Sequence, residues 1–195
     1  MDVLDRPYFG LQLIAEPIEA LVRKFQVQGP ATVQPAITPL LFPSQPYRPG
    51  PDSDPMVLWS PTCAPHLTAF MPRIESGDYF VLSYACQTMS LGAMAVRSTC
   101  DGAEWPLNEF IAYAEGKRQR IVRTMKDPRW DFWADGAALS FEDVAKYEER
   151  LIRKRLARQD VITYAESWGA PIRDAAFWTT AVNAYTFVQR AAGDE

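Results

Sequence analysis

Proline is concentrated in one part of this chain: 11 of its 16 prolines fall between Pro30 and Pro72. Each proline fixes φ, lacks a backbone N–H donor and clashes with the preceding turn of an α-helix, so this segment cannot form long helices. The missing donor also argues against central strands of a sheet. We therefore expect residues 30–72 to be extended, in short pieces near 32–42, 56–62 and 67–72, with a surface loop at 44–55.

The residues before this segment have a helical pattern. Ile18, Leu21, Val22 and Phe25 follow the i, i+3, i+4, i+7 spacing that places apolar side chains on one face of a helix. Pro17 fits the first turn of that helix, where its missing N–H donor has no partner to lose. Over residues 7–26 we expect two helical parts, so that 1–29 form an N-terminal helical segment.

A helix is expected at the start of the next segment, residues 73–136. Ser76 or Asp78 can cap a helix that runs to about Leu91. Gly92 follows it, where a glycine in the left-handed conformation often ends a helix.

An antiparallel meander is expected after this helix, over about 93–134. Its strands are predicted from stretches that alternate in polarity, as half-buried strands do: 93–99, 107–114, 120–126 and 129–134. Three dipeptides indicate the turns that end these strands: Glu115-Gly116, Asp127-Pro128 and Asp135-Gly136.

The strongest local helix signal covers about 140–156. Ser140 and Asp143 resemble a capping box, and Leu139 with Val144 occupy the two positions of a hydrophobic staple. Acid–base pairs four residues apart add about 0.2–0.5 kcal/mol each to an isolated helix. Two such pairs are present, Glu142 with Lys146 and Glu149 with Arg153.

The remaining C-terminal residues are harder to assign. A helix over about 159–168 is predicted to end at Gly169, with Pro171 beyond it. The last segment, about 174–191, fits either a helix or a strand. We expect residues 137–195 to form a mainly helical C-terminal portion.

Together these patterns predict an α+β fold. We expect one domain over 1–195, built on a mostly antiparallel sheet with helices on one side and a C-terminal helical portion. A length of 195 residues with 48% hydrophobic and 23% charged residues suits a globular domain with its own core.

Charge and cysteine usage limit the partners and the compartment. The net charge is −4, and the halves before and after Cys100 each carry −2 (6 − 8 and 14 − 16), so no electrostatic tail attracts nucleic acid or a membrane surface. The start of the chain lacks the features of a signal peptide. Residues 79–96 are too polar for a membrane span. Three unpaired cysteines favour the reducing cytoplasm.

Local motifs of catalysis and cofactor binding are missing. His66 is the only histidine, which excludes metal sites built on two histidines. Phosphate-binding glycine loops and the G-x-S-x-G motif are absent. Cys63 and His66 could pair as nucleophile and base, but Pro65 separates them and no orienting partner is nearby. We predict no catalytic residue, no metal and no cofactor, and keep as an alternative a small hydrolase-like enzyme whose site is dispersed along the sequence.

Arginine and tryptophan mark the candidate partner-binding residues, which are Arg118, Arg120, Trp130 and Trp133. Strand alternation places Arg118 and Arg120 on one face of the sheet and Arg123 on the other. Trp130 and Trp133 fall on opposite faces, so one of them is expected in the core. Because the arginines do not form one stripe and the pI is near 5.1, nucleic-acid binding is only a third hypothesis.

Four stretches resemble a group of small bacterial proteins: FMPRIESGDYFVLSY, AVRST, RWDFWADGAALSFEDVAKYEERLIRKRL and WGAPIRDAAFW. Some members of this group are antidote (immunity) proteins encoded beside secreted antibacterial toxins. The resemblance covers about 69–178 and implies a cytoplasmic antidote that binds and blocks a toxin. It assigns no functional residues.

The leading hypothesis is therefore a non-enzymatic bacterial protein-binding domain of the cytoplasm, with toxin neutralisation by occlusion as its specific form. The expected partner is a protein, with no membrane association. The sequence leaves open the identity of the partner, the face that binds it and whether the chain forms a homo-oligomer.

Overall fold

The computed structural model describes residues 3–28, 31–36, 40, 42, 56–72, 79–100 and 102–189. In chain order the strands are β1 (Tyr8–Ile14), β2 (Ala31–Pro35), β3 (Met56–Trp59), β4 (Thr68–Met71), β5 (Ala93–Thr99), β6 (Leu107–Ala114), β7 (Lys117–Lys126), β8 (Trp130–Asp135) and β9 (Tyr185–Gln189). The helices are α1 (Ile18–Gln28), α2 (Tyr79–Met89) and α3 (Arg158–Ser167), and 3₁₀ turns occur at η1 (Val3–Asp5), η2 (Val144–Glu148), η3 (Ile152–Lys154) and η4 (Ala175–Trp178).

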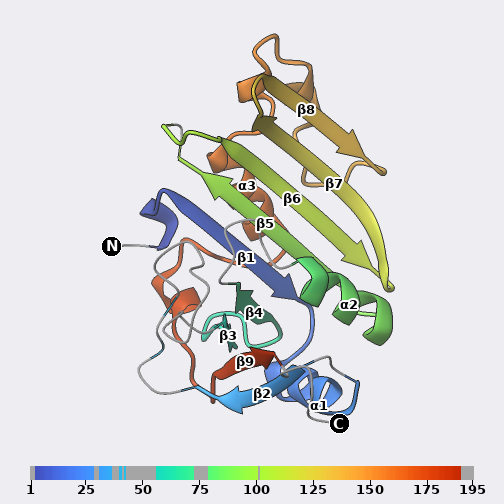
Figure 1. Cartoon of the computed structure of the whole chain (residues 1–195), viewed down its shortest axis with the longest axis vertical. Coiled ribbons are helices and arrows are strands. Elements are labelled where there is room, and N and C mark those ends of the chain that lie inside the picture. The colour runs from blue at the N-terminus through green and yellow to red at the C-terminus, as the bar shows by residue number, and fades with distance from the viewer. Residues whose placement is uncertain are drawn as a thin grey trace.

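These nine strands form a single antiparallel sheet, which confirms the predicted α+β class (Figure 1). The strand order is β2-β9-β3-β4-β1-β5-β6-β7-β8. The N-terminal strand β1 therefore lies at the centre of the sheet, and β2 and β8 form its described edges. The C-terminal strand β9 pairs with both β2 and β3, so it lies between two strands from the first third of the chain.

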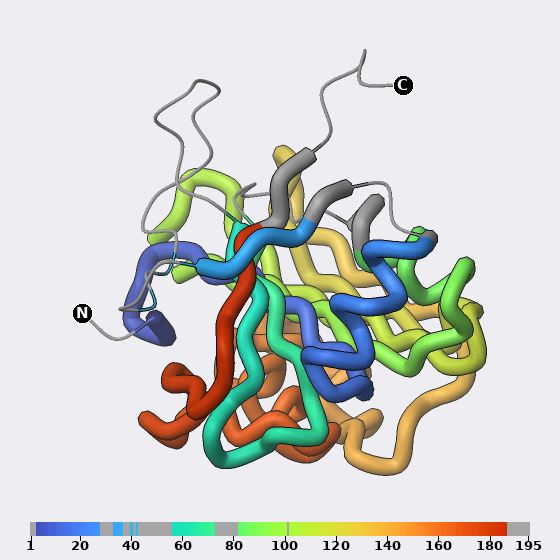
Figure 2. The backbone as a smooth tube through the Cα atoms, turned by 90° about the horizontal axis from the view of Figure 1, so that it is seen from below, coloured from blue at the N-terminus to red at the C-terminus, as the bar shows by residue number. Residues whose placement is uncertain are grey.

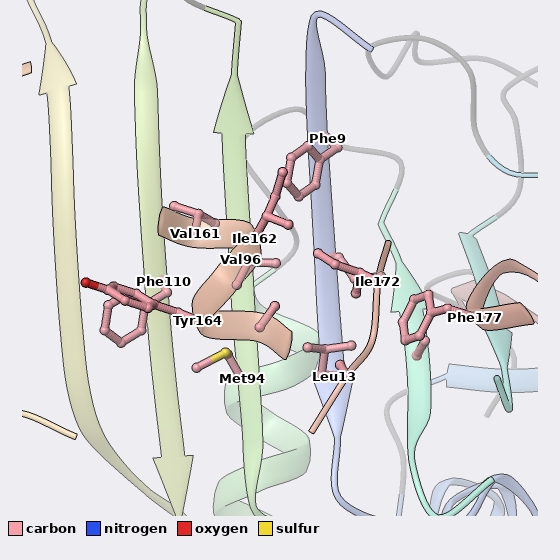
Figure 3. Close-up of a cluster of buried hydrophobic side chains, with 14 of the residues drawn as sticks. Phe9, Leu13, Met94, Val96, Phe110, Val161, Ile162, Tyr164, Ile172 and Phe177 are labelled. Carbon is pink, nitrogen blue, oxygen red and sulfur yellow. The ribbon is translucent and has the colours of Figure 1, made fainter. Parts of the chain in front are cut away.

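Both faces of the sheet are buried at its centre. One face, called here the α3 face, packs against α3 and the segment around it, with Met94, Val96 and Phe110 in its core (Figure 3). The other, called here the α2 face, packs against α1 and α2, with Ala95, Ile111 and Ile121 in its core. Figure 2 shows residues 136–180 gathered on the side of the sheet away from α1 and α2. The helices are thus divided between the two faces instead of lying on one side.

The N-terminal segment is only half helical, because β1 replaces the first predicted helical part. Residues Phe9–Ile14 are all buried, so the strand is apolar on both faces and lacks the alternation of a half-buried strand. The second part is confirmed as α1, whose Ile18, Leu21 and Phe25 enter the α2 face.

The proline-rich segment contributes the expected short extended pieces, β2, β3 and β4. The prediction that it avoids central strands was wrong, because β3 and β4 are internal to the sheet. Prolines at 61 and 72 lie just outside these two strands, where no ladder hydrogen bond is lost. The predicted loop at 44–55 lies outside the described residues.

The helix and meander of residues 79–136 are confirmed as α2 and β5–β8. Glu115 and Gly116 both have positive φ, 50° and 74°, as the two central residues of a type I′ hairpin turn require. After α2 the positive φ, 53°, belongs to Ser90 and not to the predicted Gly92. The predicted caps Ser76 and Asp78 lie outside the described residues.

The helix predicted over 140–156 does not form. Only the short turns η2 and η3 occur there, with Val144 half exposed and no side-chain capping bond from Asp143. Lys146 forms its ion pair with Asp160 instead of with the residue four positions before it. A tertiary charge pair has replaced a local one, and the helix loses its support.

The C-terminal portion is less helical than predicted. The helix expected at 159–168 is confirmed as α3, and Gly169 follows it with a left-handed φ of 113°. The ambiguous last segment contains the turn η4 and then the strand β9. Within the described residues, no helix combines the length and the apolarity that a bilayer span requires.

Candidate functional site

A β-bulge in β7 decides which arginines share a face. Ala112 of β6 pairs with Arg120, but its neighbour Tyr113 pairs with Arg118, so Gln119 is an extra residue in β7. The extra residue turns Arg118 to the α2 face, together with Arg123, and leaves Arg120 on the α3 face. The prediction that Arg118 and Arg120 share a face was therefore wrong, because simple alternation does not hold across a bulge.

Arg120 is buried on the α3 face, so it cannot contact a partner as predicted. Its side chain is 6% exposed and forms an ion pair with the fully buried Glu142, with Nη2–Oε2 at 2.7 Å and Nε–Oε1 at 3.0 Å. Arg120 Nη1 also donates to the carbonyl of Gly136 at 2.6 Å. Tyr147 donates its hydroxyl to Glu142 at 2.8 Å. This network attaches the segment after β8 to the sheet.

Burial and hydrogen bonding change the protonation of this network. Burial, with hydrogen bonds to Tyr164 and Glu142, raises the pKa of Tyr147 far above its ordinary value. For Arg120, burial lowers the pKa, but the hydrogen bond and the charge of Glu142 outweigh it and the net direction is upward. Arg120 therefore stays charged and Tyr147 stays neutral, which fits a structural ion pair and not an acid–base catalyst.

Trp133 is the centre of the exposed part of the α2 face. Its side chain is 40% exposed, and two guanidinium groups lie over its ring, Arg118 at 5.9 Å and Arg123 at 5.6 Å from the ring centroid. Arg118 also pairs with Asp135 at 3.3 Å across the β7–β8 ladder. We call the surface formed by Arg118, Arg123, Trp133 and Asp135 the arginine–tryptophan face.

A second layer of charges supports this face from the neighbouring strands. Glu109 of β6 is the cross-strand partner of both Arg97 and Arg123. Its ion pair with Arg97, 2.9 Å from Nε to Oε1, is largely buried. The Nε of Arg123 is also buried, and among the described residues it has no hydrogen-bond partner.

The cover on the α2 face stops short of Trp133. The buried residues of α2, such as Leu82 and Cys86, belong to the cluster that contains Ile121. In Figure 1 α2 crosses the near side of the sheet at one end, while β7 and β8 continue beyond it with the 136–157 segment behind them. The arginine–tryptophan face thus lies at the margin of the cover that α2 gives to this side of the sheet, next to the packed Ile121.

The four predicted partner-binding residues are not brought together. Arg118 and Trp133 share one surface, Arg120 is internal, and Trp130 lies on the opposite face, partly buried. The sequence analysis missed Arg123 as part of this surface. Its signal is the cross-strand pair Arg123–Trp133, which appears only once the register of β7 and β8 is known.

The Cys63–His66 pair does not form a catalytic site. Both residues are exposed, and no hydrogen bond joins their side chains. Partial desolvation and the negative charge of Asp174 raise the pKa of the Cys63 thiol. A nucleophilic cysteine needs a lowered pKa to supply thiolate, so this environment disfavours catalysis by Cys63.

Metal ligands are likewise dispersed in the part of the chain that is described, where no three His, Cys, Asp or Glu side chains are grouped so that they could hold an ion. Comparison of the chain with protein-family models, with curated proteins and with solved structures finds no match.

Proposed function

We propose that this chain is a non-enzymatic protein-binding domain and that the arginine–tryptophan face is its docking surface. The observation that carries the proposal is the exposed Trp133 with Arg118 and Arg123 over its ring. Tryptophan and arginine are the residue types most enriched at energetic hot spots of protein interfaces. On monomer surfaces away from interfaces an indole is more often covered.

The setting of Trp133 reduces the cost of binding. Its strand is hydrogen-bonded to β7 from Ile121 to Lys126, and the two arginines restrict the ring further. An anchor that is already ordered loses little side-chain entropy when a partner covers it. The face can therefore contribute affinity with a small contact area.

The charges on this face indicate what kind of partner would fit it. Arg118 and Arg123 lie beside the ring, while Asp131 and Asp135 follow the outer strand β8. A fitting partner is a folded protein with an apolar hollow for the indole and carboxylates beside it. Its basic groups would lie opposite β8. Such a mixed pattern fixes orientation and favours one partner over others.

Toxin neutralisation is the specific form of this proposal. It rests on the resemblance of residues 69–178 to antidote proteins. In this form the chain would act in the bacterial cytoplasm and block a secreted antibacterial toxin by covering its working surface.

The experiment is a binding measurement with the product of the gene beside the one that encodes this chain. Isothermal titration would compare the natural chain with Trp133→Ala and Arg123→Gln. We expect either substitution to weaken binding at least about 30-fold, the effect of losing a hot-spot residue worth 2 kcal/mol. Trp105→Ala is the matched control, because Trp105 is 57% exposed but lies in the β5–β6 connection.

Binding that survives Trp133→Ala and Arg123→Gln would remove this face from the proposal. Failure of the neighbouring product to bind, and of the chain to protect cells that express it, would remove the toxin form.

Nucleic-acid binding, the weaker alternative, predicts an affinity that falls steeply with salt. The carboxylates Asp131 and Asp135 beside the arginines make it less favourable. An enzymatic role would require turnover that depends on Cys63 or on a carboxylate pair.

A further inference from the structure

A hollow of about 520 Å³ lies on the α3 face, on the side of the sheet opposite Trp133. It is formed between the ends of β5, β6 and β8 and the turns η2 and η3. Its polar and aromatic lining includes Cys100, Asn108, Trp130, Lys146, Arg153 and Lys154. This volume lies within the range of about 300–1,000 Å³ that is usual for small-molecule sites.

Positive charge exceeds negative charge around this hollow. Three cations line it, Lys146, Arg153 and Lys154, against one carboxylate, Glu149. Lys146 is matched by Asp160, whose oxygens lie 2.5 and 2.6 Å from its Nζ. Arg153 and Lys154 form no ion pair within the described ranges. The hollow is therefore suited to an anion, and two donors are free to reach it.

Asn108 supplies a neutral donor from the floor of the hollow. The residue is 6% exposed, and its Oδ1 accepts a hydrogen bond from Ser98 Oγ at 2.5 Å. Because the carbonyl side of the amide is used in this way, the Nδ2 hydrogens are directed away from Ser98. An amide at the wall of a hollow can donate these hydrogens to a ligand that accepts hydrogen bonds.

Trp130 and Pro106 form an apolar wall beside these donors. Trp130 is partly buried and belongs to the lining of the hollow. An indole offers a flat surface on which a planar ring stacks favourably.

We propose that this hollow binds a small organic anion, with a planar ring against Trp130 and Pro106 and a carboxylate or phosphate between Arg153, Lys154 and the Asn108 amide. This site is separate from the arginine–tryptophan face and does not depend on the protein-binding proposal.

A small molecule fits this hollow better than a nucleic-acid strand. A second hollow of about 780 Å³ adjoins it at Cys100 and Ala157. Two of its three arginines are already engaged: Arg158 donates to the carbonyls of Leu4 and Arg6, at 2.6 and 2.7 Å, and Arg173 pairs with Glu166. Few cations therefore continue the positive charge beyond the first hollow, as a nucleic-acid strand would need.

Four probes separate the ring from the charge in an isothermal titration at low salt. Phenyl phosphate and benzoate carry both features, inorganic phosphate carries the charge alone, and benzyl alcohol carries the ring alone. We expect phenyl phosphate or benzoate to bind at least about tenfold more tightly than either partial probe, since each loses a charge-assisted bond or a stacking contact. Whichever of these two probes binds more tightly shows whether the site prefers a phosphate or a carboxylate.

Substitutions then test whether the probe binds in this hollow. Arg153→Gln combined with Lys154→Gln should weaken the stronger probe at least about tenfold, the loss expected for a charge-assisted hydrogen bond. Arg150→Gln is the matched control, because Arg150 is an exposed arginine one turn earlier that does not line the hollow. An equal effect of Arg150→Gln would overturn the site.

Cys100 provides a readout that does not depend on affinity. In a Cys63→Ser background, Cys100 is the accessible thiol among the described residues, because Cys86 is buried. Saturation with phenyl phosphate should slow its alkylation by iodoacetamide several-fold. Unchanged alkylation, absence of binding by all four probes at millimolar concentration, or tighter binding of a 12-nucleotide single-stranded RNA would each overturn the proposal.

Discussion

Arg120 and Glu142 form the best-connected polar contact between the sheet and the segment that follows it. Both side chains are almost fully buried, and three donor–acceptor distances between them lie between 2.7 and 3.1 Å. A buried ion pair is not strongly stabilising in itself, because desolvation opposes the attraction. Replacing only one partner of the pair costs free energy, because the other charge then remains buried without a counter-charge.

We therefore expect Arg120→Met to lower the free energy of unfolding by about 3–5 kcal/mol. Arg118→Met is the matched control, because Arg118 pairs with Asp135 on the surface, where a pair is worth about 0–1 kcal/mol. Urea unfolding followed by circular dichroism measures both. The double substitution Arg120→Met with Glu142→Met should recover only part of the loss, because Tyr147 and the backbone N–H of Leu139 then lose their acceptor. Equal effects of Arg120→Met and Arg118→Met would contradict this account.

Cys86 gives the protein a dependence on alkaline pH. Burial raises the pKa of its thiol from 9 to about 12. The raised pKa contributes stability below pH 9, and this contribution is lost as the pH rises from about 9 to about 12, because the unfolded chain releases the proton first. By pH 10 the loss amounts to roughly 1 kcal/mol.

The measurement compares the natural chain with Cys86→Ala by urea unfolding at pH 8 and pH 10. The substitution lowers stability at both values, but it should remove the thiol's share of the pH dependence. Other buried groups, such as Tyr147, contribute equally to both proteins and cancel. The same loss of stability between the two pH values in both proteins would show that Cys86 does not titrate in this way.

The sequence predicts the sheet face of some residues correctly and of others wrongly. Trp130 and Trp133 were placed on opposite faces, as the structure has them, because alternation holds along β8. Arg118 and Arg120 were misplaced because the bulge at Gln119 has no glycine to mark it. The ion pair of Arg120 joins residues 22 positions apart, and no local pattern in the sequence indicates a contact of that range.

At the scale of elements, Gly136 couples the end of β8 to the start of β7. It has φ of +88°, and a Cβ atom there would lie 2.0 Å from the backbone oxygen of Gln119. Its own carbonyl accepts the bond from Arg120. The glycine is therefore required by its conformation and by its close approach to the neighbouring strand.

Gly136→Ala should lower the free energy of unfolding by about 2–4 kcal/mol, because both the left-handed φ and the backbone contact resist a side chain. Gly102→Ala is the control, since a Cβ atom at Gly102 has nothing within 4 Å. Its effect should stay within about 1 kcal/mol. Thermal unfolding measures the stability of each variant. If Gly136→Ala left the free energy of unfolding unchanged, β7 and β8 would separate more easily than their register indicates.

Elements were predictable where local signals decide them. The meander β5–β8 has alternation and marked turns, and α1 and α3 have apolar spacing or a C-terminal glycine. β1 was missed because it is buried on both faces. The helix over 140–156 was predicted from local charge pairs, but Glu142 and Lys146 bind Arg120 and Asp160 instead. Contacts distant in sequence overrode an adequate local preference.

At the scale of the whole molecule, strand β1 joins two groups of strands into one sheet. β1 pairs with β4 on one side and with β5 on the other, so it links the strands β2, β9, β3 and β4 to the meander. β9 returns from the C-terminal portion to pair with β3. The arginine–tryptophan face, the proposed docking surface, lies on the meander, at the edge farthest from β9.

This arrangement predicts a gradient of local stability across the sheet. β1 is buried from Phe9 to Ile14 and is hydrogen-bonded on both sides, so its amides should exchange with solvent only when the whole protein unfolds. β8 is an edge strand with four exposed residues of six, so its amides should exchange through local opening at a lower free energy. Hydrogen exchange at increasing sub-denaturing urea distinguishes the two routes, because global unfolding depends on urea more steeply than local opening does. If β8 exchanged as slowly as β1, with the same urea dependence, the meander edge would belong to the same cooperative unit as the centre. The arginine–tryptophan face would then be carried by a rigid edge and not by the part of the sheet that opens most easily.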